Sequence, residues 1–307
     1  MTPGLRTEPA GPGVWLAEVA VLIMALIWGI NYSVIKYGTS VVPPLAYNCV
    51  RIVLAAVALS AIALIWGGPA PRRNDVLTLL ALGALGNGIY QVFFVEGLAR
   101  TRAGEAALVV GASPALMALL ARMRGLERIN RRGAFGIALS IFGVGLIVLG
   151  RATSGGNAHG GSLTGDLLVL CGAVCWAVYT VFLMPYTRRV GGWWVTSLTV
   201  VGGSAVLAIV GGADILTVHW QSLPTGAWAA ILYSGLGALV IAYMFWYYGI
   251  RVLGPTRTAL YGNFQPLIAL LVAWLTLGEV PTAWQAVGAA TIVSGVVLTR
   301  MPASEPS

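Results

Sequence analysis

Ten long apolar stretches run through the chain and constrain its fold more than any other feature of the sequence. Each has about twenty mostly apolar residues, the length that an α-helix needs to cross about 30 Å of hydrocarbon. Only 9% of the 307 residues are charged and 58% are hydrophobic, which excludes an ordinary soluble enzyme. The sequence therefore predicts an all-α membrane protein with ten transmembrane helices. They cover approximately residues 15–37, 44–66, 75–97, 103–121, 133–150, 164–186, 193–211, 225–248, 256–277 and 282–299.

Basic residues are concentrated in alternate connections between these stretches. If the N-terminus is cytoplasmic, thirteen arginines fall in cytoplasmic segments, whereas Lys36, Arg100, Arg102 and Arg151 fall outside. Because Lys and Arg accumulate on the cytoplasmic side, both termini are predicted to be cytoplasmic. The net charge of +8 forms no single basic stripe, so no nucleic-acid partner is expected. A bacterial inner membrane is the expected location, because eukaryotic targeting signals are lacking.

Residues suited to catalysis or metal binding are missing from the apolar stretches. Cys49, Cys171 and Cys175 lie within them, but without the histidines or further cysteines that a zinc site needs, and both histidines lie in connections. The sequence also lacks the glycine-rich phosphate loop of an ATPase. We therefore expect no catalytic residue, no metal site and no cofactor, which argues against an enzyme.

The two halves of the chain repeat one another. Aligning residues 83–146 with residues 235–298, an offset of 152, gives sixteen identical pairs in sixty-four positions, among them Pro114 with Pro266. Each half contains five apolar stretches, so the second copy must enter the membrane upside down. Transporters built from inverted repeats bind their substrate near the bilayer midplane, between the repeats.

The repeat predicts two domains of the same kind. The first five-helix repeat covers residues 15–150 and the second, inverted one covers residues 164–300. Between them lies a segment rich in Gly and Ser, residues 153–164, which predicts a flexible connection.

Four segments carry the marks of a known family. They are ALIWGINYSVIKYG in the first apolar stretch, PPLAYNCVRIVLAA entering the second, EGLARTRAGEAALVVGASPALMALLA around the fourth, and GPTRTALYGNFQPLIALLVAWLTLGEVPTAWQAVGAATIVSGVVL over the last two. Together they resemble the EamA branch of the drug/metabolite transporter superfamily, over about residues 15–300. The resemblance implies a ten-helix secondary transporter of the inner membrane that moves small metabolites, often outward, through a central cavity. It does not fix the substrate, because the family is broad.

Polar and aromatic side chains within the apolar stretches indicate where a substrate could bind, because polar groups in hydrocarbon are costly unless they face protein or water. Asn87, Tyr90 and Gln91 share one helical face by their spacing. On a regular helix Asn263 and Gln265 point about 200° apart, so both could face one cavity only if Pro266 distorts the helix. The alternative is that these polar groups join helices to one another. The predicted substrate-binding residues are Trp28, Asn31, Asn87, Tyr90, Gln91, Trp176, Tyr179, Tyr261, Asn263 and Gln265.

Arg51 is the one basic residue that lies well within an apolar stretch. Its planar group could bind a carboxylate or phosphate, or it could extend to the outer surface about 10 Å away. The resemblance favours a structural role, since an arginine here is common in the family. Pro114 and Pro266, near the middle of their stretches, each remove a backbone hydrogen bond, so they predict either hinges or fixed kinks.

Acidic residues lie at the ends of the apolar stretches and none is central. A proton-coupled exporter of cations would be expected to bury a carboxylate near the midplane. The sequence therefore favours an alternating-access exporter of amino acids or similar neutral or zwitterionic solutes. Multidrug or cation efflux, and a non-transporting sensor or assembly protein, are the alternatives.

The expected partners are the lipid bilayer and a small-molecule substrate. Gly136 and Gly143, like Gly288 and Gly295, recur at seven-residue spacing and predict a face on which another helix packs closely. That helix could belong to the same chain or to a second copy. We expect a monomer, with a homodimer as the alternative.

Overall fold

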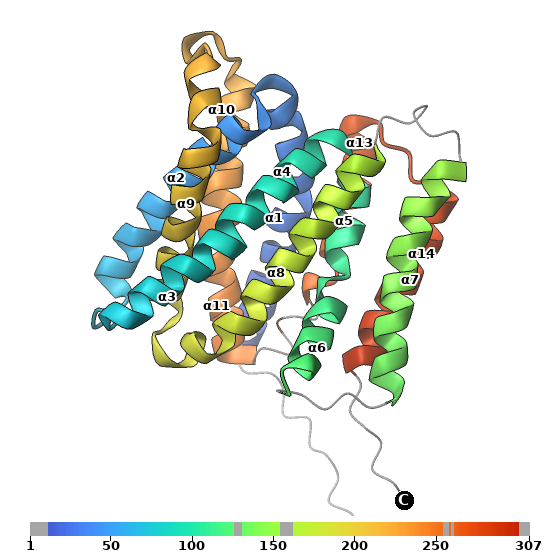
Figure 1. The fold of residues 1–307 in the computed structure, drawn as a ribbon, viewed down its shortest axis with the longest axis horizontal. Coiled ribbons are helices and arrows are strands. Elements are labelled where there is room, and N and C mark those ends of the chain that lie inside the picture. The colour runs from blue at the N-terminus through green and yellow to red at the C-terminus, as the bar shows by residue number, and fades with distance from the viewer. Residues whose placement is uncertain (1–11, 126–130, 154–161, 254–257, 259–260, 301–307) are drawn as a thin grey trace, which may run out of the picture.

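The computed structural model describes residues 12–125, 131–153, 162–253, 258 and 261–300. Within these residues every regular element is a helix (Figure 1). In the described part of the chain, eight helical segments are long and apolar enough to cross a membrane, and two shorter apolar helices follow, Gln265–Leu277 and Ala283–Leu298. The chain is thus an all-helical, multi-pass membrane protein, as predicted. Most of the segment between the predicted repeats, and residues 256, 257, 259 and 260 of the ninth predicted stretch, lie outside the described residues.

The helices follow the predicted stretches and extend past several of their ends. The first half contains α1 (Pro12–Val41), α2 (Pro44–Trp66), α3 (Arg73–Gly83), η1 (Ala84–Ile89), α4 (Tyr90–Arg100), α5 (Ala103–Gly111), α6 (Ser113–Met123) and α7 (Arg131–Thr153). The second contains α8 (Leu163–Arg189), α9 (Gly192–Thr217), η3 (Trp220–Ser222), α10 (Thr225–Leu232), η4 (Tyr233–Ile241), α11 (Ala242–Leu253), α13 (Gln265–Leu277) and α14 (Ala283–Arg300).

Two of the spans contain a π-helical segment. It is η1 between α3 and α4, and η4 between α10 and α11. The offset of 152 between the two halves maps Ala84–Ile89 onto residues 236–241, which lie within η4. Hydrogen bonds in a π-helix connect residues five apart instead of four, and such segments often lie at functional sites. Apolar periodicity did not predict either segment.

Pro114 and Pro266 begin helices instead of kinking them. α5 ends at Gly111 and α6 starts at Ser113, so Pro114 lies in the first turn of α6, and Pro266 likewise lies in the first turn of α13. A proline loses no hydrogen bond there, because the first turn has free N–H groups in any case. A Cβ added to Gly111 would lie 2.9 Å from Cγ of Pro266. The end of α5 therefore lies against the start of α13.

The predicted glycine faces meet within the chain. α7 and α14 lie side by side at one edge of the molecule (Figure 1). A Cβ on Gly143 would lie 3.0 Å from the carbonyl oxygen of Gly288, and one on Gly295 would lie 2.5 Å from that of Gly136. The small residues thus allow α7 and α14 to approach closely.

Candidate functional site

A cavity of about 1320 Å³ lies between helices of both halves. A volume of this size exceeds that of a typical small-molecule site. Aromatic rings from five helices form much of its wall: Trp28, Tyr32, Tyr90, Phe94, Trp176, Tyr179, Trp193, Tyr243, Trp246, Tyr247 and Tyr248. Amide side chains and Arg51 supply polar groups between these rings.

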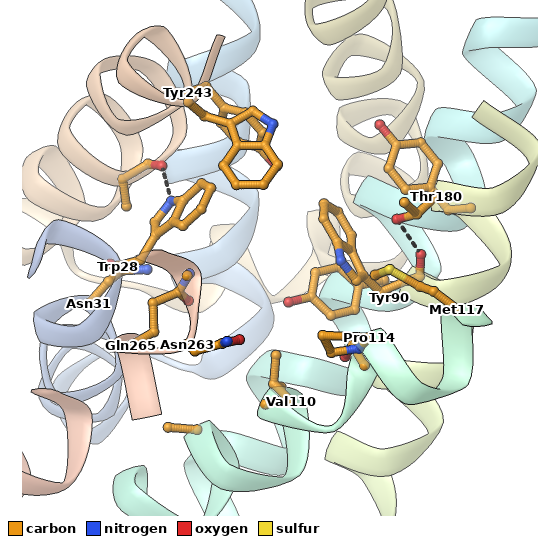
Figure 2. Close-up of a pocket in the computed structure, with 18 of the residues that line it drawn as sticks. Trp28, Asn31, Tyr90, Val110, Pro114, Met117, Thr180, Tyr243, Asn263 and Gln265 are labelled. Atoms are coloured by element: carbon orange, nitrogen blue, oxygen red, sulfur yellow. Dashed lines mark hydrogen bonds between the residues drawn. The ribbon is translucent and has the colours of Figure 1, made fainter. Parts of the chain in front are cut away.

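The structure brings most of the predicted binding residues to this cavity. Eight of the ten line it: Trp28, Asn31, Tyr90, Gln91, Trp176, Tyr179, Asn263 and Gln265. Pro114 and Pro266 line it as well. Figure 2 shows Asn31, Asn263 and Gln265 gathered on one side of the cavity, with Tyr90 and Thr180 on the other.

Asn87 and Tyr261 are not among the residues that line the cavity. Asn87 lies in η1, is 2% exposed, and has its Cβ against Gly203 of α9. Asn87 therefore packs against α9. Tyr261 packs its ring near Phe264.

Asn263 and Gln265 both line the cavity, although a regular helix would point them in opposite directions. Gly262, Asn263 and Phe264 precede α13, and Asn263 and Phe264 form a turn. The rotation of about 100° per residue in a regular α-helix therefore does not apply across this turn, and both amide side chains reach the cavity.

Trp28 connects the wall of the cavity to the second half of the chain. Its indole Nε1 donates a hydrogen bond to the carbonyl oxygen of Ala238 in η4, at 2.8 Å (Figure 2). Its ring lies 5.6 Å from that of Tyr243 in an edge-to-face arrangement and 5.9 Å from that of Trp246. Edge-to-face aromatic pairs of this kind stabilise packing. Most of the aromatic run of α11 lines the cavity as well: Tyr243, Met244, Trp246, Tyr247 and Tyr248.

A second aromatic group forms the opposite wall. The ring of Tyr90 stacks on Phe94 at 5.5 Å and lies 5.2 Å from Trp176, which in turn lies 5.2 Å from Tyr179. The hydroxyl of Tyr179 donates a hydrogen bond to Thr199 Oγ1 at 3.2 Å. These contacts hold the aromatic rings in place along this wall of the cavity.

Arg51 does not extend to the surface. The side chain is 1% exposed and lines the cavity. Its Nε donates to Asn48 Oδ1 at 2.7 Å and its Nη2 donates to Gln91 Oε1 at 2.7 Å. Asn48 Nδ2 donates to the backbone oxygen of Gln91 at 3.1 Å, which closes a buried network between α2 and α4.

The cavity reaches one end of the helices. Its lining includes Arg124, Thr187 and Arg251, which lie at or next to the carboxyl ends of α6, α8 and α11. All three residues are exposed. A ligand could enter the cavity from this end.

A polar network lies at the opposite end of the molecule and connects both halves. Lys36 Nζ donates to the carbonyl oxygens of Leu98 and Ala99, each at 3.0 Å. The Thr101 hydroxyl is hydrogen-bonded to the carboxylates of Glu105 and Asp166.

The same network continues to α13 and α14. Gln285 Nε2 donates to Glu105 Oε1 at 3.1 Å, and Glu279 Oε1 accepts from the backbone N–H of Ala103 at 3.1 Å. Arg102 Nη2 donates to the carbonyl oxygen of Val280 at 2.6 Å. These contacts hold the loop before α5 against the loop between α13 and α14.

Sequence comparison places the chain among transporters. The sequence model of the EamA-like transporter family matches residues 15–149 and 163–301. The chain belongs to the EamA-like transporter family. Members and relatives of this family are named as membrane transporters and not as enzymes.

Similar proteins span nearly the whole chain. This EamA-like transporter is 26% identical to the "Uncharacterized transporter YyaM" of Bacillus subtilis (strain 168), over 91% of this chain and 92% of that protein. It is 29% identical to the "Probable terminal-alkyne amino-acid exporter" of Streptantibioticus cattleyicolor, over 91% of each protein. A crystal structure matches with a TM-score of 0.64 at 20% identity, over 93% of this chain and 96% of its own, which shows a shared fold.

The predicted binding residues leave out several residues that line the cavity of this EamA-like transporter. Tyr243, Met244 and Trp246 belong to the aromatic run of α11, and their apolar character looks the same whether they face lipid or a cavity. The offset of 152 between the two halves could have identified Tyr243, because it aligns Tyr243 with the predicted binding residue Gln91. Arg51 could be noticed as a lone charge, but its partners could not be read from its own helix alone.

Proposed function

We propose that the chain is a secondary transporter that binds a small zwitterionic metabolite, such as an amino acid, in the aromatic cavity and exports it by alternating access. One observation carries the proposal: the cavity is built from both halves, reaches one end of the helices, and has a polar network across the other end. A transporter that exposes its site to one side at a time needs this asymmetry.

The chemistry of the wall supports a zwitterionic or neutral substrate. Among the described residues, no Asp or Glu lines the cavity, so a cation finds no carboxylate partner there. Amide side chains both donate and accept hydrogen bonds, which suits a solute with groups of both kinds. The similarity to a probable amino-acid exporter points the same way.

We further propose that the ten helical spans form two inverted repeats, residues 15–150 and 164–300. The contacts between α7 and α14 support this arrangement. Gly136 lies against Gly295 while Gly143 lies against Gly288, and the offset of 152 makes Gly288 the equivalent of Gly136. Such reciprocal pairing is what a two-fold axis between the repeats produces. The family match to two successive segments also supports it.

Orientation follows from the basic residues. With cytoplasmic termini in a bacterial inner membrane, Arg124, Arg189 and Arg251 lie on the cytoplasmic side, and the cavity faces the cytoplasm. Arg6, Arg128 and Arg257, which contribute to this assignment, lie outside the described residues. We propose that the transporter works as a monomer in the bilayer, because its glycine faces are already used within the chain.

Counterflow into proteoliposomes tests the function. Purified full-length protein is reconstituted, loaded with one unlabelled solute at a time, and supplied with a trace of the same labelled solute outside. The panel contains the twenty amino acids, purines, sugars and quaternary amines. We expect accumulation for at least one amino acid and none in empty liposomes. Accumulation of quaternary amines alone would favour cation efflux, and no accumulation at all would favour a sensor or assembly role.

A further inference from the structure

We propose that Arg51 and Gln91 form a carboxylate-binding subsite in the wall of the cavity, so that the substrate carries a carboxylate group. This inference rests on the proposed transport function and narrows its substrate class. It follows from three features of the buried network on α2 and α4: the unused donors of Arg51, the fixed orientation of Gln91, and the lack of acidic groups facing them.

Arg51 keeps donors for a ligand. Its guanidinium group has five N–H bonds, and the structure gives hydrogen bonds from Nε and Nη2 only. Nη1 makes no hydrogen bond with any described residue, and no described carboxylate lies within ion-pair distance of Arg51. A charge at 1% exposure within a membrane protein is costly without a counter-ion. The cavity that Arg51 lines is where an anionic group could approach it.

Gln91 presents a second donor. Arginine can only donate hydrogen bonds, so the amide atom of Gln91 that faces Arg51 must be its oxygen. The NH₂ group of Gln91 then points away from Arg51, and it donates to no described residue. Gln91 also lines the cavity. Asn48 holds this arrangement, because it accepts from Arg51 Nε and donates to the backbone oxygen of Gln91.

The free donors of Arg51 and Gln91 favour an anion. A planar carboxylate has two oxygens that can accept from a guanidinium group and a neighbouring amide together. Among the described lining residues the charged ones are Arg51, Arg124 and Arg251, so the cavity carries no negative charge that would repel a carboxylate.

Other amide side chains in the lining can accept hydrogen bonds. Asn31 lines the cavity, and Asn31 Oδ1 is buried without a hydrogen-bond partner. Figure 2 places Asn31 beside Asn263 and Gln265. The amide oxygens of these residues can accept from an ammonium group, while the carboxylate of the same molecule binds Arg51. A cavity with both kinds of group suits an α-amino acid better than a simple carboxylate.

Binding of matched compounds tests the subsite. The probes are the twenty amino acids and L-propargylglycine, each beside its amide and its decarboxylated amine, and affinity is measured by calorimetry on the purified full chain. We expect wild type to bind at least one acid tenfold or more tighter than its amide. Arg51→Gln and Gln91→Leu should each weaken binding of the acid roughly ten- to a hundredfold, the range for a hydrogen bond to a charged group. Binding of the amide should hardly change.

The ratio of the affinity for the acid to the affinity for its amide distinguishes a substrate-binding role of Arg51 from a purely structural one. If Arg51 only ties α2 to α4, its loss weakens both compounds alike and leaves their ratio unchanged. Thr180→Val is the matched control, because Thr180 lines the cavity but its hydroxyl already donates to the carbonyl oxygen of Trp176. We expect this variant to keep the ratio of wild type. Gln91→Leu retains Arg51, so it carries the test if Arg51→Gln does not fold.

Three results would overturn the subsite: equal affinity of wild type for acid and amide, a ratio retained in both variants, or no binding of any acid. The proposed function has a separate readout in counterflow. If an amino acid and its amide are transported equally well, the subsite is wrong and the transporter stands. If none of these compounds is transported, the amino-acid function fails as well.

Discussion

The side chain of Trp28 links α1 to η4, the π-helical segment of the other half. The indole Nε1 donates to the carbonyl oxygen of Ala238 at 2.8 Å, and the ring packs against Tyr243 and Trp246. The residue therefore serves two purposes: its ring forms part of the cavity wall, and its N–H pairs a backbone oxygen in η4.

Replacing Trp28 by Phe separates these purposes. Trp28→Phe keeps an aromatic ring but leaves the Ala238 carbonyl without its donor, which costs about 1–3 kcal/mol. We expect a lower melting temperature of the purified protein in detergent. Trp15→Phe on the same helix is the control, because Trp15 is 60% exposed. Equal melting temperatures of the two variants would show that the bond to Ala238 contributes nothing.

At the residue level, the sequence predicted the type of site better than its individual contacts. Helical spacing identified Tyr90 and Gln91, which line the cavity, because both lie in the regular helix α4. It also selected Asn87, which lies in the π-helical segment before α4 and packs against α9. The pairing of Arg51 with Gln91 joins residues forty positions apart on different helices, and spacing along one helix carries no information about such a contact.

The helix breaks before Pro114 and Pro266 are the elements best placed to bend. Both prolines start a helix, both line the cavity, and the break after Gly111 lies against Pro266. A break in a helix at the substrate site lets the two parts of a span move differently, and such conformational steps often limit turnover.

Pro266→Ala or Pro114→Ala should slow transport more than it weakens binding. Alanine permits helical hydrogen bonding through the break, so we expect the transport rate to fall about tenfold, or about 1.4 kcal/mol in the barrier, with affinity changed much less. Rates come from counterflow and affinities from calorimetry. Pro224→Ala, at the start of α10 and away from the cavity, is the control. If both cavity variants transport at the wild-type rate, the breaks are fixed features of packing.

At the level of helices, the length of the apolar stretches predicted where the spans occur. It did not predict the π-helical segments or the helix breaks within them. Hydrophobic stretches have the same composition whether the backbone is α-helical or π-helical, so η1 and η4 were invisible. Pro114 and Pro266 did mark the spans that break between α5 and α6 and before α13. The sequence does not show that the residues before each proline leave the helix first, and whether the prolines act as hinges stays a prediction.

The whole molecule combines an accessible end with a closed one. At the closed end, Glu279 follows α13 and accepts hydrogen bonds from the backbone N–H groups of Ala103 and Gly104, at 3.1 and 3.4 Å. These N–H groups begin α5, where a helix favours negative charge. Glu279 therefore joins the second half of the chain to the first, and we expect it to stabilise the state in which this end is shut.

Glu279→Gln should shift the equilibrium toward the state that is open at this end. The amide loses the charge that strengthens both hydrogen bonds, and charge-assisted bonds contribute about 1.5–3 kcal/mol, enough to change a two-state population ratio about tenfold or more. A cysteine at position 117 in the cavity wall reports access, in a background without Cys49, Cys171 and Cys175. An impermeant thiol reagent is added separately to each side of oriented membranes. We expect faster labelling from the Glu279 side in the variant than in its parent, and slower labelling from the other side.

Glu96→Gln is the matched control, because Glu96 pairs with Arg100 on its own helix and not across the halves. If the labelling rates change equally in both variants, or in neither, Glu279 does not control access to the cavity. Only a contact between the two halves can change which end of the cavity is open.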